Sequence, residues 1–230
     1  MRITTPRWAP GTGATRAVAL EVLIHGPLSR SEVARRLDLS PGSLTRLSTP
    51  LLDMGVLVDA GEQIDGKVGR PVQLLDIVPG SKRFIGMKLT ADAVLGVTTD
   101  LRGNVLASQS RALPGRQPER VADTIAELVA ALSAGTPEVT AIGVGIGGLV
   151  DEHGFVRSAP FLEWSDVPLG QLIEARAGIP AIVANDLAAY TEYEHWFGAG
   201  SGLDRFAVVT LGAGIGFGLR RDGLPWGGPG

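Results

Sequence analysis

A short polar face near the start of the chain carries the side chains best suited to chemistry. Ser43, Thr45, Arg46 and Thr49 recur at the spacing of one outward face of a helix. Hydroxyl and guanidinium groups on such a face can donate hydrogen bonds to base edges and to phosphates in the major groove of DNA. The spacing therefore predicts a helix that reads DNA.

Residues 29–55 contain the two short helices that must position this face. Ser29 followed by Glu32 has the pattern of a capping box at a helix start. Ser40 followed by Pro41 is an N-cap with a proline at the first helical position of the next helix. The pair predicts a helix-turn-helix. One apolar stripe for each helix is supplied by Val33, Ala34 and Leu37 and by Leu44, Leu47 and Leu51.

The flanking segments complete a small domain. Residues 14–25 have the apolar period of a helix, which ends at a Gly-Pro pair. Residues 56–58 and 72–77 read as two strands around a polar tip at 61–69. Three helices followed by a β-hairpin predict a winged helix-turn-helix.

The hairpin tip adds two cations to the expected DNA-binding surface. Lys67 and Arg70 are suited to lie in a minor groove or along phosphates. Pro50 falls inside the expected recognition helix, where we expect it to bend the helix without ending it. A surface helical hairpin that touches no DNA stays open as an alternative, because this geometry also occurs in proteins without that activity.

The composition is that of a folded protein without membrane spans. The 230 residues are 44% apolar and 20% charged, and no apolar run approaches the roughly 18 residues of a membrane helix. Residues 1–13 lack the apolar core of a secretory signal and are expected to form a flexible arm. The chain has no cysteine, which excludes disulfides and thiolate zinc sites and fits a cytoplasmic location.

Charge is distributed unevenly along the chain. Residues 1–82 hold ten Lys or Arg against eight Asp or Glu, whereas residues 83–230 hold eleven against sixteen. The net charge of −3 argues against a protein that coats nucleic acid. Because the first part is only weakly basic, we expect two copies to act together, which implies a homodimer on a two-part DNA site.

After residue 83 the pattern changes to that of an α/β lobe. Three short strands form a meander, and helices and strands then alternate. This is the order of the ribonuclease-H-like lobe of sugar kinases and actin. The expected strands are 84–89, 94–100, 105–109, 139–146, 179–184 and 206–211, and the expected helices are 121–132, 169–177 and 187–197.

Three motifs in this lobe carry a resemblance: GVGIGGLVD at 143–151, VANDLAAYTEYEHWFGAG at 183–200 and VVTLGAGIGFG at 208–218. With the winged helix in front, residues 14–228 resemble the ROK family of bacterial sugar kinases and sugar-responsive repressors. A winged helix fused to this lobe marks the repressor branch. The expected domains are a flexible arm (1–13), a winged helix-turn-helix (14–78), a linker (79–83), a first ROK lobe (84–202) and the start of an incomplete second lobe (203–230).

The resemblance assigns roles to four residues of the lobe. Asp186 matches the family's catalytic base, which takes a proton from a sugar hydroxyl during phosphoryl transfer. Asn185 matches a sugar-hydroxyl ligand, and Gly147 and Gly148 are expected beside the same effector. The alternative for the Asn-Asp pair is a structural role as the cap of the helix that follows.

Two segments match the family's phosphate loops. The family's kinases carry Asp-x-Gly-Gly-Thr after the first strand, where residues 88–92 are Lys-Leu-Thr-Ala-Asp. Lys88 in place of a metal-facing carboxylate implies that phosphoryl transfer is lost. The glycine-rich segment 212–218 matches the second loop, with a plain hairpin turn as the alternative. The vestigial loop is expected to use Gly212, Gly214 and Gly216.

The family's cysteine cluster for zinc has no counterpart in this chain, so we expect no cofactor and interpret the chain as a fragment of a longer protein. The sequence favours a transcriptional regulator, a repressor of carbohydrate genes that binds double-stranded DNA and responds to a sugar effector. Two alternatives stay open: a ROK sugar kinase with Asp186 as base, and a non-functional fragment. The sugar, the operator and the choice between activation and repression are left undetermined.

Overall fold

The computed structural model describes residues 13–63, 72–135, 138–212, 215–221 and 224–225. By their contacts, the residues fall into two units. The first unit contains the residues up to Lys82 together with Asp100–Asn104, and the second contains Arg83–Thr99 and the residues from Val105 onward. Among the described helices, none is long and apolar enough to cross a membrane.

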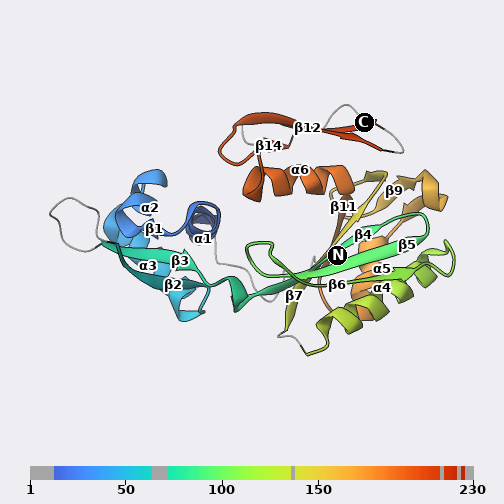
Figure 1. Cartoon of the computed structure of the whole chain (residues 1–230), viewed down its shortest axis with the longest axis horizontal. Coiled ribbons are helices and arrows are strands. Elements are labelled where there is room, and N and C mark those ends of the chain that lie inside the picture. Colours follow the sequence, from blue (N-terminus) through green and yellow to red (C-terminus); the bar gives the residue numbers. More distant parts are fainter. Residues whose placement is uncertain (1–12, 64–71, 136–137, 213–214, 222–223, 226–230) are drawn as a thin grey trace. The chain divides into compact units, whose positions relative to one another are not determined.

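The first unit places three helices beside a small antiparallel sheet (Figure 1). Strand β3 is central in this sheet, because it pairs with β1 on one side and with β2 on the other. Val22, Leu51 and Leu75, from two helices and the central strand, are fully buried in its core. The elements are α1 (Gly13–His25), β1 (Leu28–Ser29), α2 (Arg30–Arg36), α3 (Pro41–Asp53), β2 (Leu57–Gln63), β3 (Val72–Ile77) and the short 3-10 helix η1 (Pro79–Ser81).

The starts of α2 and α3 follow the predicted capping chemistry. The hydroxyl of Ser29 accepts a hydrogen bond from the Glu32 amide, and that of Ser40 accepts one from the Ser43 amide. The reciprocal half of the capping box is replaced by ion pairs, because the Glu32 carboxylate binds Arg35 and Arg36. Pro50 lies inside α3, which continues to Asp53 as predicted.

The second unit is built on a five-stranded mixed sheet with the order β11-β7-β4-β5-β6. The strands β4, β7 and β11 are parallel to one another, whereas β5 is antiparallel to both β4 and β6. The carboxyl ends of the parallel strands therefore meet at one edge. These elements are β4 (Arg83–Leu89), β5 (Ala93–Thr99), β6 (Val105–Ala112), α4 (Pro118–Ser133), β7 (Val139–Ile146), α5 (Leu169–Ala177) and β11 (Ala181–Asn185).

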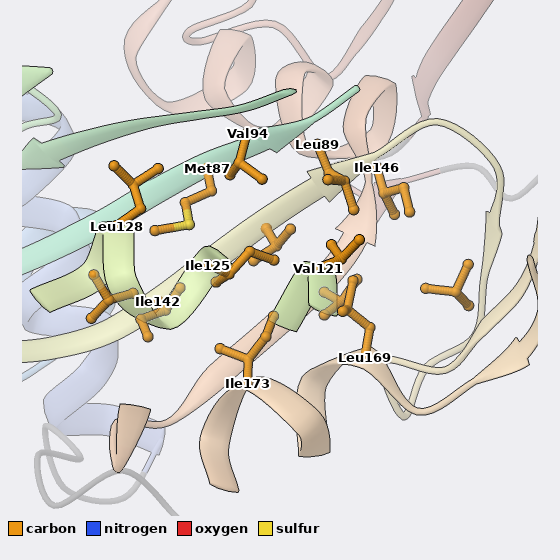
Figure 2. Packing of buried hydrophobic residues seen from close by; sticks show 14 of the residues in the cluster. Met87, Leu89, Val94, Val121, Ile125, Leu128, Ile142, Ile146, Leu169 and Ile173 are labelled. Atoms are coloured by element: carbon orange, nitrogen blue, oxygen red, sulfur yellow. The ribbon is translucent and has the colours of Figure 1, made fainter. Parts of the chain in front are cut away.

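Helices α4 and α5 close one face of this sheet. Figure 2 shows Ile125 of α4 and Ile173 of α5 pointing toward Ile142 and Met87 of the strands. Side chains from both layers are almost fully buried, so this cluster is the main core of the second unit. Burial of each such side chain stabilises the fold by about 1.5–3 kcal/mol.

Between β7 and α5 lies a small three-stranded sheet that the sequence analysis missed. Its order is β10-β9-β8, and its strands are antiparallel. Trp164 is buried there, and its indole N–H donates a hydrogen bond of 2.6 Å to the carbonyl of Arg116. The elements are β8 (Leu149–Val150), β9 (Val156–Ala159), the 3-10 helix η2 (Pro160–Leu162) and β10 (Trp164–Val167).

The last part of the second unit packs a hairpin on α6 (Asp186–Phe197) (Figure 1). Strands β12 (Arg205–Leu211) and β13 (Ile215–Arg221) pair antiparallel, and β13 also pairs with β14 (Leu224–Pro225). This corrects the extent of the glycine-rich loop predicted at 212–218, since β13 already begins at Ile215. Gly216 and Gly218 lie within β13, where a Cβ atom on either would press against side chains of α6.

The other face of the β12–β13 hairpin is apolar and exposed. Val209 lies opposite Phe217, and Leu211 lies opposite Ile215. Between 63% and 82% of each of these four residues is exposed in the described structure. We refer to these four residues as the apolar ladder.

His195 makes the junction of α6 and β12 sensitive to pH. Its ring stacks on Phe206, and its buried Nδ1 atom has no hydrogen-bond partner in the described structure. Burial, followed by the charge of Arg220, lowers the pKa of His195, against an opposing effect of Glu192. The folded protein therefore takes up this proton less readily than the unfolded chain, whose histidine pKa is about 6.5.

Because the folded pKa lies below the unfolded one, the stability that neutral His195 contributes is present above about pH 6.5. This contribution is lost as the pH falls below that value. We expect the free energy of unfolding, measured with urea between pH 7.5 and 5.5, to fall toward acid. His195→Gln should flatten this profile. Equal profiles for wild type and His195→Gln would contradict the assignment.

Candidate nucleic-acid interface and candidate sugar site

The predicted polar residues lie together on the outer side of α3. Thr45, Arg46 and Thr49 are exposed, and Ser43 is half-buried near the helix start. The opposite side of the helix buries Leu44, Ser48 and Leu51 in the first unit. Helical periodicity thus separates a core face from a free polar face, as the sequence predicted.

The hydroxyl groups on this face are not all free to donate. Thr45 donates its hydroxyl hydrogen to the carbonyl of Pro41 at 3.0 Å, and Thr49 donates its own to the carbonyl of Thr45 at 2.8 Å. This corrects the expectation that both threonines are donors toward a ligand, since a hydroxyl has one hydrogen. Ser43 accepts a hydrogen bond from the Ser40 hydroxyl, so its own hydrogen stays available. Arg46 is held by no hydrogen bond or ion pair in the part of the chain that the structure describes.

A polar clamp that the sequence analysis missed fixes α3 to its neighbours. The guanidinium of Arg30, at the start of α2, donates to the hydroxyl of Ser48 at 3.3 Å and to the carboxylate of Asp59 at 2.9 Å. Ser48 is fully buried on α3, and Asp59 lies on β2. The clamp therefore joins two helices and one strand, and it holds the polar face at a fixed orientation to the sheet.

The other arginines beside the helix pair are engaged internally. Glu32 binds both Arg35 and Arg36, and Arg36 also binds Glu21 of α1. The hydrogen bond from Arg35, followed by that from Arg36, lowers the pKa of Glu32 to about 2. These pairs neutralise the cations of α2, so Arg46 is the cation that α3 presents freely. Lys67 and Arg70, the predicted cations of the hairpin tip, lie outside the described residues.

In the second unit, the residues predicted to contact a sugar gather where β7 and β11 end. Asn185 caps α6, since its Oδ1 atom accepts hydrogen bonds from the amides of Leu187 and Ala188, both at 3.0 Å. Its Nδ2 atom donates to the carbonyl of Gly148 at 2.9 Å. Asn185 therefore acts as the helix cap that was the alternative to a sugar contact. One N–H of its amide remains for a ligand.

Asp186 is joined to Lys88 by an ion pair that crosses 98 positions of sequence. The Lys88 Nζ atom lies 3.1 Å from the Asp186 Oδ2 atom, and the Oδ1 atom accepts a hydrogen bond from the Leu187 amide at 2.9 Å. The side chain of Lys88 is 60% exposed and that of Asp186 is 30% exposed, so the pair is open to solvent. Each carboxylate oxygen has one partner, so a lone pair on each remains for a further hydrogen bond, and a sugar hydroxyl that binds Oδ2 would share it with Lys88.

Among the glycines predicted for the ligand sites, Gly148 has a clear structural reason for being glycine. Gly148 has φ 139°, and a Cβ atom there would overlap the Ser158 carbonyl on β9. A Cβ atom on Gly147 would touch the ring of Phe161. Of the glycine-rich segment, Gly212 lies in the bend after β12, Gly216 lies in β13, and Gly214 is outside the described residues.

The second unit corresponds to a known protein family. The ROK family model matches residues 84–230. The chain belongs to the ROK family. Its mixed α/β sheet agrees with the ROK fold, because a solved ROK family transcriptional regulator, described as a homologue of Escherichia coli Mlc, superposes with a TM-score of 0.75 at 25% identity. That match covers 92% of this chain and 55% of the regulator.

Two curated relatives differ in how much of the chain they match. The DNA-binding transcriptional repressor Mlc of Escherichia coli is 25% identical over 217 residues, which is 91% of this chain and 53% of Mlc. The glucokinase of Streptomyces coelicolor is 34% identical over 136 residues, which is 59% of this chain and 42% of the enzyme. The chain spans about half the length of the curated relatives it matches.

The described residues of this ROK chain include no cluster of metal ligands. The sequence has no cysteine, and the described residues contain no group of three or more His, Asp or Glu side chains placed to hold an ion. At the end of β4, where the resemblance places a metal-facing carboxylate, the ammonium group of Lys88 would repel a cation.

Proposed function

We propose that this ROK chain is a DNA-binding transcriptional regulator, with a winged helix-turn-helix in the first unit and a sugar-responsive ROK lobe in the second. One observation carries the proposal: the regulator and repressor matches extend over 91–92% of the chain, so they include the first unit. The glucokinase match covers 59% of this chain. The second unit, which the ROK family model matches, is long enough to account for all of it. Kinase similarity therefore accounts for one unit, and regulator similarity accounts for both.

The geometry of the first unit supports this proposal. Helices α2 and α3 are joined by a short turn at Asp38, and the β2–β3 hairpin follows as a wing. The capped, clamped α3 presents Arg46 and Ser43 on a free face, as a recognition helix does in a major groove. We propose double-stranded DNA as the partner, bound by a homodimer in the cytoplasm, with repression of carbohydrate genes as the outcome.

DNA binding can be tested directly with the full 230-residue chain. We expect selection from a pool of random duplexes to enrich a common sequence, and fluorescence anisotropy to show tighter binding to it than to a scrambled duplex. Affinity should fall steeply with salt, because arginine contacts with phosphate release counterions. Failure to bind any duplex at about 50 mM salt would refute the proposed function.

For the ROK lobe we propose effector binding without phosphoryl transfer. The argument is electrostatic: Lys88 already neutralises Asp186, and its ammonium group opposes the metal ion that ATP requires. We expect a coupled assay with glucose, N-acetylglucosamine and xylose to give background rates of ADP formation. The control is Lys88→Ala, which frees Asp186 and should also stay inactive because a metal carboxylate is still missing. Robust turnover that is abolished by Asp186→Asn would favour the kinase alternative.

A further inference from the structure

Two threonines on α3 are arranged to present methyl groups on the exposed face. The hydroxyl hydrogens of Thr45 and Thr49 are both given to backbone carbonyls four residues earlier. Each threonine Cβ atom carries one hydroxyl and one methyl branch, and in this geometry the hydroxyl branch is turned toward the helix backbone. The methyl is therefore the branch that remains for a partner on an otherwise polar surface.

The two threonines are one turn apart on α3, and one cation lies beside them. Thr45 and Thr49 are one helical turn apart, which is about 6 Å along the axis. That distance equals between one and two base-pair steps of about 3.4 Å. Arg46 lies three positions before Thr49, so these two side chains are neighbours on the helix surface, whereas Thr45 and Arg46 point in different directions around the same exposed side.

Each of these groups has a distinct counterpart in the major groove. Thymine alone displays a methyl group there, and apolar contact with it is a recurrent use of threonine methyls. Guanine displays two acceptors that match the guanidinium fork of arginine. We infer that α3 reads a pair of thymine methyl groups through Thr45 and Thr49, beside a guanine read by Arg46. This inference rests on the proposed function and specifies the bases that the proposed regulator selects.

The competing role for the threonines is acceptance of a hydrogen bond by the hydroxyl oxygen. Oxygen lone pairs remain after donation, and the amino groups of adenine and cytosine are donors in the same groove. Side-chain exchange separates the two roles. Threonine to valine keeps a methyl and removes the oxygen, whereas threonine to serine keeps the oxygen and removes the methyl.

The test uses the full chain and the duplex that it enriches from a random pool. Thymines of that duplex are replaced one at a time by deoxyuridine, which lacks only the methyl group. We expect two positions, one or two steps apart, at which wild type binds deoxyuridine about fourfold more weakly, from about 0.8 kcal/mol per buried methyl-sized group. Replacing both should cost about 16-fold. Circular dichroism confirms that each variant keeps its helices.

The variants assign the two positions. Thr49→Ser should bind the thymine duplex about fourfold more weakly and no longer distinguish deoxyuridine at one position, while Thr49→Val should keep the distinction. Thr45→Ser and Thr45→Val should behave likewise at the other position. Equal binding of thymine and deoxyuridine by wild type, or loss of the distinction in the valine variants, would overturn the inference while the proposed function stands. Absence of binding to every duplex would overturn both.

Discussion

Replacement of Arg46 by alanine should weaken binding to the selected duplex by about 1–3 kcal/mol, roughly 5- to 160-fold. Arg46 is exposed on α3 and is held by no partner in the described part of the chain, so its guanidinium is available for a base edge. Binding to a scrambled duplex should change much less, because loss of a base contact mainly removes discrimination. Fluorescence anisotropy with both duplexes at several salt concentrations measures the difference.

A variant with the same change in net charge provides the control. Arg111 is an exposed arginine on β6 of the second unit, and Arg111→Ala should leave both affinities within about twofold of wild type. An Arg46→Ala protein that still prefers the selected duplex as strongly as wild type would show that α3 does not read bases through this residue.

Replacement of Gly218 by alanine should destabilise the protein by about 1–3 kcal/mol, the usual cost of forcing an extra methyl group into a packed interface. A Cβ atom at this position of β13 would overlap the Thr191 hydroxyl and lie 3.1 Å from the Thr191 Cβ atom on α6. Thr191 is itself buried and its hydroxyl donates to the Leu187 carbonyl, so it has little room to move. Urea unfolding followed by fluorescence measures the change.

Gly143 offers a matched control for this substitution. It also lies within a strand, β7, but a Cβ atom there would meet nothing within 4 Å. Gly143→Ala should therefore be neutral or slightly stabilising, since alanine restricts the unfolded chain. Equal destabilisation by both variants would mean that strand propensity, and not the contact with α6, decides the outcome.

Local rules in the sequence were sufficient for most of the secondary structure. The caps at Ser29 and Ser40 and the apolar stripes of α2 and α3 depend on residues within one turn of each other, and the structure confirms them. The strands of the main sheet were predicted from their apolar runs, and β4 and β7 contribute inward-facing side chains to the core of the second unit. These features need no knowledge of distant partners.

The features that were missed depend on distant partners. Strand β1 has two residues and exists through its pairing with β3, while β8, β9 and β10 have two to four residues each. The segment at 212–218 was predicted as a loop because of its glycines, but Gly218 lies in β13 at a point where Thr191 of α6 leaves no room for a Cβ atom. Short strands carry too little periodicity to be identified, and glycine alone does not distinguish a turn from close packing.

In the candidate sites, too, the local features were predictable from the sequence and the contacts between distant residues were not. Residue types and helical spacing placed Arg46 and the threonines on one face, but spacing does not reveal how a hydroxyl is oriented. The pairing of Lys88 with Asp186 joins the end of β4 to the start of α6, and only the parallel arrangement of β4, β7 and β11 brings these residues together. The family resemblance had identified Lys88 as anomalous, and the structure adds the carboxylate to which it is bound.

The apolar ladder on β12 and β13 has a consequence for the solution behaviour of this chain. Four large apolar side chains form a flat surface on a hairpin, and the net charge of −3 supplies little electrostatic repulsion between molecules. Solubility should therefore reach its minimum near the isoelectric point of about 5.6. It should also fall in ammonium sulfate, because excluded salts strengthen apolar association. Purification above pH 7.5 in low concentrations of a mild detergent should keep the molecules dispersed.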